Sequence, residues 1–153
     1  MSTVYIDADA CPVKDEVYKV AGRYALRVVV VANATLRVPA EPLVELIVRT
    51  GFGAADDYIA EQIGSGDIVI TADIPLAARC LAAGGRVVDP RGRAITDNEI
   101  GHLLGMRDLM DNLRQSGDAM GGPPPMVAKD RSRFLSTLDE VINAVRRMKP
   151  PEK

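Results

Sequence analysis

Hydrophobic positions in this chain alternate between short continuous runs and stretches with helical spacing. Residues 3–6 and 26–32 are β-branched or aliphatic runs, as expected of strands that are covered on both faces. Between them, apolar side chains recur at helical spacing after Pro12, which the first turn of a helix tolerates because its missing N–H would be unpaired there. The opening segment therefore predicts a strand, a helix and a second strand.

The same alternation continues to residue 88. Helices are predicted over 56–63 and 75–83, and strands over 67–71 and 86–88, of which 86–88 is expected to be the last. The segment 43–49 predicts a further strand, although its Leu and Glu content also permits a helix. Strands that alternate with helices favour an α/β fold, with three layers formed by a parallel sheet and helices on both faces.

A C-terminal helical extension is predicted from about residue 96. Thr96 or Asp97 can cap a helix that runs to about Gln115, since such side chains accept hydrogen bonds from first-turn amides. The Gly- and Pro-rich segment 116–127 predicts a turn or loop. A final helix over about 130–148 carries one apolar stripe along its length.

Size and composition bound the possible functions. The 153 residues, 47% hydrophobic and with a net charge of −2, fit one core and exclude a strongly basic protein that coats nucleic acid by bulk charge. We expect a single domain over 1–148 and a frayed tail over 149–153. Widely separated cysteines, and no apolar run long enough to span a membrane, favour a reduced, cytoplasmic protein without a membrane partner.

Several familiar chemical motifs are incomplete. Gly51-Phe52-Gly53 lacks the full dinucleotide fingerprint and no Walker lysine follows a glycine run, so no nicotinamide, flavin or ATP site is predicted. Cys11 precedes a helix, where a thiolate would be stabilised, but no His is near in sequence to act as a base, and a packing role is favoured. His102, the one histidine, falls inside a predicted helix, where a structural or surface role is favoured.

Acidic residues follow three of the predicted strands. Because the carboxyl ends of parallel strands share one edge of a sheet, we expect these carboxylates to gather there. Gathered carboxylates repel one another unless a cation offsets their charge, and an all-oxygen site suits Mg²⁺ or Mn²⁺. Any one of them could instead cap a helix or belong to a turn. The candidate metal ligands are Asp7, Asp9, Asp56, Asp57, Asp73 and Asp89.

Separated motifs carry a family resemblance from about residue 3 to residue 145. They are residues 7–14 (DADACPVK), 71–77 (TADIPLA), 89–92 (DPRG), 121–123 (GGP) and 130–134 (DRSRF). Together they resemble the bacterial YaiI/YqxD family, which is similar to the PIN-domain nucleases. PIN domains place acids at the carboxyl edge of a parallel sheet and cut RNA with Mg²⁺ or Mn²⁺. The resemblance implies a PIN-like fold and a metal-dependent nuclease acting on RNA.

The resemblance implies catalytic roles for Asp7, Asp57 and Asp73, with a metal-activated water as nucleophile and Asp56 as the alternative on the middle helix. One metal or two are both compatible with this mechanism. Basic residues could contact the phosphates of a substrate, although ordinary surface charge or an ion pair would look the same in sequence. These candidates are Lys14, Arg107, Arg131 and Arg133.

The sequence also permits two other functions. A phosphatase of the haloacid dehalogenase type would use Asp7 as nucleophile and Asp9 as acid, but Ala10-Cys11 stands where that family has Gly-Thr. A non-catalytic nucleic-acid-binding or regulatory protein of the same fold would bind without cutting. The phosphatase ranks below the nuclease also because the acidic pair at 56–57 precedes Thr71, whereas the phosphatase order puts its acidic pair last.

Overall fold

The computed structural model describes residues 2–115 and 125–148, and its elements follow the predicted order closely. Part of the predicted loop, 116–124, and the predicted tail, 149–153, lie outside the described residues. The elements are β1 (Thr3–Asp7), a 3₁₀ turn (Ala8–Ala10), α1 (Lys14–Arg23), β2 (Arg27–Ala32), β3 (Val44–Val48), α2 (Ala54–Gln62), β4 (Ile68–Ile70), α3 (Ile74–Ala82), β5 (Arg86–Val88), β6 (Ala94–Ile95), α4 (Asp97–Gln115) and α5 (Ala128–Met148).

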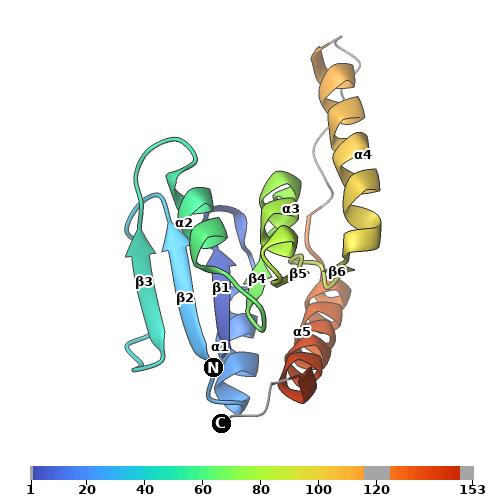
Figure 1. Ribbon diagram of the computed structural model, residues 1–153. Helices are drawn as coiled ribbons and strands as arrows, with labels where there is room; N and C mark the ends of the chain where they lie inside the picture. Colours follow the sequence, from blue (N-terminus) through green and yellow to red (C-terminus); the bar gives the residue numbers. More distant parts are fainter. Residues whose placement is uncertain (1, 116–124, 149–153) are drawn as a thin grey trace.

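The described strands form one sheet in the order β3-β2-β1-β4-β5-β6, parallel from β3 through β5. The arrowheads of β1, β2 and β3 point the same way in Figure 1. The ambiguous segment 43–49 is a strand, since β3 pairs with β2 along its length from Val28↔Val44 to Ala32↔Val48. The strand order reverses direction at β1, which has β2 on one side and β4 on the other.

One element departs from the prediction that 86–88 is the last strand. Ala94 and Ile95 form β6, which pairs antiparallel with β5 through Val87↔Ile95 and Val88↔Ala94. The intervening turn is held by Asp89, whose Oδ1 accepts hydrogen bonds from backbone amides on the far side of the turn, two and four residues ahead. A strand of two residues is too short to show an alternating pattern, so the periodicity could not reveal it.

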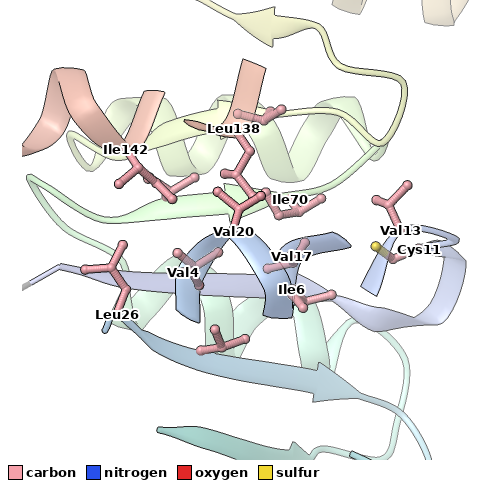
Figure 2. Packing of buried hydrophobic residues seen from close by; sticks show 14 of the residues in the cluster. Val4, Ile6, Cys11, Val13, Val17, Val20, Leu26, Ile70, Leu138 and Ile142 are labelled. Atoms are coloured by element: carbon pink, nitrogen blue, oxygen red, sulfur yellow. The ribbon is translucent and has the colours of Figure 1, made fainter. Parts of the chain in front are cut away.

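Strand side chains alternate between two hydrophobic clusters, one on each face of the sheet. On one face, Val4 and Ile6 pack with α1 and α5, as Figure 2 shows for Val17, Val20 and Leu138. On the other face, strand residues such as Tyr5, Val29 and Val69 pack with α2 and α3, and Ile100 and Leu103 of α4 join them at the edge. The three-layer α/β prediction is thus confirmed, and the architecture is consistent with a PIN-like fold.

The predicted helical extension divides into two unlike helices. Phe134 and Leu138 of α5 are both 0% exposed, so α5 completes the core beside α1. By contrast, α4 extends away from the sheet in Figure 1, and its Met106 and Leu109 are exposed. Across the residues that the structure describes, no helix has the length and apolar character needed to cross a membrane.

Candidate functional site

A cavity of about 380 Å³ opens at the carboxyl ends of β1, β2 and β4. The connection after β1 leads to α1 on one face of the sheet, whereas the connection after β4 leads to α3 on the other face. Such a reversal leaves a crevice where open α/β sheets bind ligands. Four of the six predicted acids are in the wall, which consists of Asp7, Asp9, Asn33, Gly53, Ala55, Asp56, Ala72 and Asp73.

Asp7 and Asp73 are connected through a buried hydroxyl. Thr71, 1% exposed, donates from Oγ1 to Oδ2 of Asp7 at 2.7 Å and accepts from the backbone amide of Asp73 at 3.0 Å. Oδ1 of Asp73 accepts from the backbone amide of Leu76 at 3.0 Å, and so caps α3. Within the described part of the chain, the second oxygen of each carboxylate has no hydrogen-bond donor, which leaves it available to a ligand.

Asp9 lies on the 3₁₀ turn that follows β1. Its Oδ1 accepts a hydrogen bond from the backbone amide of Asn33 at 3.3 Å, which connects the ends of β1 and β2. Asp9 and Asn33 are both exposed and both line the cavity. They therefore form its solvent-facing side.

The acidic pair at the start of α2 is divided between two environments. Gly53, with a φ of +71°, is the N-cap and lets the chain turn into the helix beside the cavity. Asp56 lines the cavity. Asp57, about 100° further around the helix, is exposed and its Oδ1 accepts from Nη1 of Arg79 at 2.9 Å.

Asp89 is also separated from the cavity, because its carboxylate closes the β5–β6 turn. The structure thus brings together Asp7, Asp9, Asp56 and Asp73, but neither Asp57 nor Asp89.

The gathered carboxylates perturb one another. The pKa of Asp56 is raised from 3.8 to about 6, mainly by burial and then by the negative charges of Asp7 and Asp73. Burial also raises the pKa of Asp7, against the hydrogen bond from Thr71, which lowers it, while Asp73 and Asp9 raise it further. Ionising the whole set is therefore unfavourable unless positive charge enters the cavity.

The donor chemistry fits a hard cation, since the side chains that could hold one offer carboxylate oxygens and the amide oxygen of Asn33. These side chains are not, however, arranged as a formed metal site. Among residues 2–115 and 125–148, no group of three or more His, Cys, Asp or Glu side chains is arranged to hold a metal ion. The cavity is thus a gathering of carboxylates and not a closed coordination shell.

The predicted basic contacts have partners within the chain. Lys14 donates from Nζ to the Cys11 carbonyl at 2.8 Å. Arg131 donates from Nη1 to the Pro12 carbonyl at 2.9 Å and to Glu16 at 3.2 Å. These contacts attach the start of α5 to the start of α1, which follows the Asp9 turn.

Arg133 has a similar structural role at the β5–β6 turn. It donates from Nη1 to Asp130 at 3.3 Å and to the Arg91 carbonyl at 3.4 Å. Asp130 is itself buried and accepts from Nη1 of Arg91 at 2.8 Å. Arg107 lies on α4, and its side chain falls outside the described part of the structure.

Residue-type reasoning overlooked Thr71 and Asn33. Thr71 stands within the TADIPLA motif, but only its buried position between two carboxylates reveals its role. Asn33 directly follows β2, so the rule that picked acids at strand ends would have found it had amides been included. Of the residues set aside, Cys11 is buried and burial raises the pKa of its thiol, while His102 is exposed on α4.

Comparisons with known proteins identify relatives over almost the whole chain. The model of the uncharacterised YaiI/YqxD family matches residues 5–144. A UPF0178 protein of Paramagnetospirillum magneticum is 55% identical over 151 residues, covering 98% of this chain and 100% of the relative. One from Rhodospirillum centenum is 57% identical over 152 residues, covering 96% and 99%. No solved structure matches. The chain belongs to the YaiI/YqxD family.

Proposed function

We propose that this protein is a divalent-metal-dependent nuclease that cuts RNA with a metal-activated water. The observation that carries the proposal is the set of four carboxylates, Asp7, Asp9, Asp56 and Asp73, which line one cavity at the reversal of strand order. The raised pKa values of Asp7 and Asp56 support it, because burial and, after it, neighbouring negative charges disfavour the ionised carboxylates, and a cation would offset both effects.

Asp7, Asp56 and Asp73 are the residues that would hold Mg²⁺ or Mn²⁺. When bound, such an ion stabilises the developing charge on phosphate oxygens and lowers the pKa of a coordinated water. The side chains would have to rotate inward to bind it, since they do not close on one point as they stand. In Asp7 and Asp73, one carboxylate oxygen is already hydrogen-bonded and the other remains available to the ion.

Asp56 replaces Asp57 in this assignment. Both begin α2, but Asp56 lines the cavity whereas Asp57 is paired with Arg79 at the surface. The resemblance alone also allowed a catalytic role for Asp57, which this proposal gives to Asp56 instead. Thr71 is a positioning residue. Its hydroxyl donates a hydrogen bond to one carboxylate oxygen of Asp7 and accepts one from the backbone amide of Asp73.

A phosphodiester substrate is supported by basic residues beside the acidic cavity. Lys14 and Arg131 lie at the starts of α1 and α5, close to the turn that carries Asp9. Their present partners are the carbonyl groups of Cys11 and Pro12 and the carboxylate of Glu16, which a substrate phosphate would have to replace. The resemblance to PIN-domain nucleases favours RNA as the nucleic acid.

Cleavage of labelled single-stranded RNA in Mn²⁺ tests the proposal. We expect Asp7→Asn to lower the rate at least about 100-fold, because the loss of a metal ligand removes several kcal/mol of transition-state stabilisation. Asp57→Asn is the matched control, since it removes the same charge outside the cavity, and it should retain nearly the full rate. Equal background rates for wild type and Asp7→Asn would refute the nuclease.

One observation keeps the phosphatase as a second candidate: Asp7 and Asp9 line the same cavity, as its nucleophile and acid would. Phosphorylation of Asp7, detected by mass spectrometry after incubation with a phosphomonoester, would favour that reaction over the nuclease. RNA binding without cleavage, weakened steeply by salt, would instead favour a non-catalytic binding protein of the same fold.

A further inference from the structure

Phe52 is an aromatic side chain that no described part of the chain covers. All six aromatic residues lie in the described part of the chain, and the other five are buried or half-buried. Phe134, the second phenylalanine, is 0% exposed, whereas Phe52 is 108% exposed. Burying this large apolar ring against a partner would be favourable, and its full exposure leaves the ring face available to one.

Phe52 is adjacent in the chain to the wall of the carboxylate cavity. It is flanked by Gly51, with a φ of +108°, and Gly53, with a φ of +71°, both conformations that favour glycine. Gly53 lines the cavity and caps α2, which carries Asp56. The Cα of Phe52 is therefore one peptide unit, about 3.8 Å, from a residue of the cavity wall.

A guanidinium group lies on the same short connection between β3 and α2. Arg49 follows β3 directly and stacks over the ring of Tyr58, with 4.7 Å between its Cζ atom and the ring centroid. Arg49 is exposed, and Nη1 donates to the Val48 carbonyl at 3.1 Å. Its remaining N–H groups have no acceptor within the described structure, so they are free to meet a phosphate.

We propose that Phe52 stacks on an unpaired base of a single-stranded substrate, with Arg49 on a neighbouring phosphate while the scissile phosphate enters the cavity. This inference rests on the proposed nuclease and specifies its substrate class. A base inside a duplex has both faces covered by its neighbours, whereas an unpaired base offers a free face to an aromatic ring. The combination of an exposed ring, a cation and a phosphodiester-cleaving cavity favours a nucleic-acid strand over a protein partner.

The test is the affinity for a labelled single-stranded RNA of about ten nucleotides, a length that fits typical single-strand sites, measured by fluorescence anisotropy in EDTA to prevent cleavage. Phe52→Ala is expected to weaken binding about tenfold, within the range for loss of one stacked base. Phe52→Trp should restore it, and Phe52→Leu, apolar but not planar, should not. Leu43→Ala is the control, because this side chain, 40% exposed, lies at the opposite end of β3.

The outcomes separate this inference from the nuclease itself. If cleavage requires Asp7 but the KM for RNA is unchanged in Phe52→Ala, the stacking role is overturned and the nuclease proposal is retained. RNA binding that requires Phe52, without cleavage by any variant, would support the stacking role and overturn the nuclease. Full rescue by Phe52→Leu, or self-association of the wild type that Phe52→Ala abolishes with RNA binding unchanged, would overturn the stacking role.

Discussion

Replacing Asp56 by Asn is expected to stabilise the fold at neutral pH, because the native carboxylate is held in an unfavourable environment. Its pKa in the folded chain is raised to about 6 from the ordinary value of 3.8, through burial and the charges of Asp7 and Asp73. A pKa difference of about two corresponds to about 3 kcal/mol. Since Asp56 is only partly buried, solvent screening reduces the expected gain in Asp56→Asn to about 1 kcal/mol.

The sign of the pH dependence follows from the raised folded pKa of Asp56. The unfolded chain loses the Asp56 proton near pH 3.8, while the folded chain retains it to about pH 6. The wild type therefore loses stability as the pH rises through this window, and the loss is complete above about pH 6. Asp56→Asn has no proton to lose, so its advantage should be full at pH 7.5 and should shrink as the pH falls toward 4.

Urea denaturation of wild type and Asp56→Asn at several pH values, in EDTA, measures this effect. Asp57→Asn is the matched control one residue along α2. It removes a surface ion pair with Arg79 and should change the free energy of unfolding by less than about 0.5 kcal/mol. The electrostatic account of the cavity fails if Asp56→Asn is no more stable than wild type at pH 7.5. It also fails if the difference does not depend on pH.

Three further predictions concern the site and its support. Thr71→Val removes the hydrogen bond that lowers the pKa of Asp7, so this pKa should rise. The acidic limb of the pH profile of RNA cleavage should then move to higher pH, and an unshifted limb would contradict the prediction. Gly92→Ala should cost at least about 2 kcal/mol in urea denaturation, because Gly92 has a φ of +93° and a Cβ would lie 2.7 Å from the backbone nitrogen of Phe134. Gly101→Ala, in an open helical position, should instead add up to about 1 kcal/mol, and equal effects would refute the steric argument. Phe134→Ala should cost about 3 to 5 kcal/mol if α5 completes the core, whereas a cost below about 1 kcal/mol would make α5 peripheral.

Hydrophobic periodicity was sufficient to predict the layers of this fold. The runs that form β1 and β2 are apolar on both faces, a pattern expected when helices cover both sides of the sheet. The segment 43–49 stayed ambiguous because β3 is partly exposed and lacks such a run. The two residues of β6 form a strand only because the turn after Asp89 returns them to β5.

The candidate site was predictable down to the edge of the sheet, but not to individual side chains. Strand ends placed Asp7 and Asp73 together, and the structure adds that Thr71 joins them. Adjacent residues such as Asp56 and Asp57 point about 100° apart on a helix, so which one lines the cavity depends on how α2 packs on the sheet. No local pattern encodes that packing.

The partners of the basic residues depend in the same way on tertiary packing. Arg131 donates to Pro12, a residue 119 positions earlier in the chain, only because α5 packs beside α1. In the sequence, an arginine that binds a phosphate cannot be distinguished from an arginine that connects two helices.

The most direct test of the central claim is a crystal grown in Mn²⁺ and measured for anomalous scattering from manganese. The account predicts a peak in the cavity, within about 2.2 Å of carboxylate oxygens from Asp7 and from Asp56 or Asp73. It also predicts that the peak disappears in Asp7→Asn and persists in Asp57→Asn. A crystal grown in Mn²⁺ that shows no manganese peak at these carboxylates, or a peak that Asp7→Asn leaves unchanged, would contradict the account.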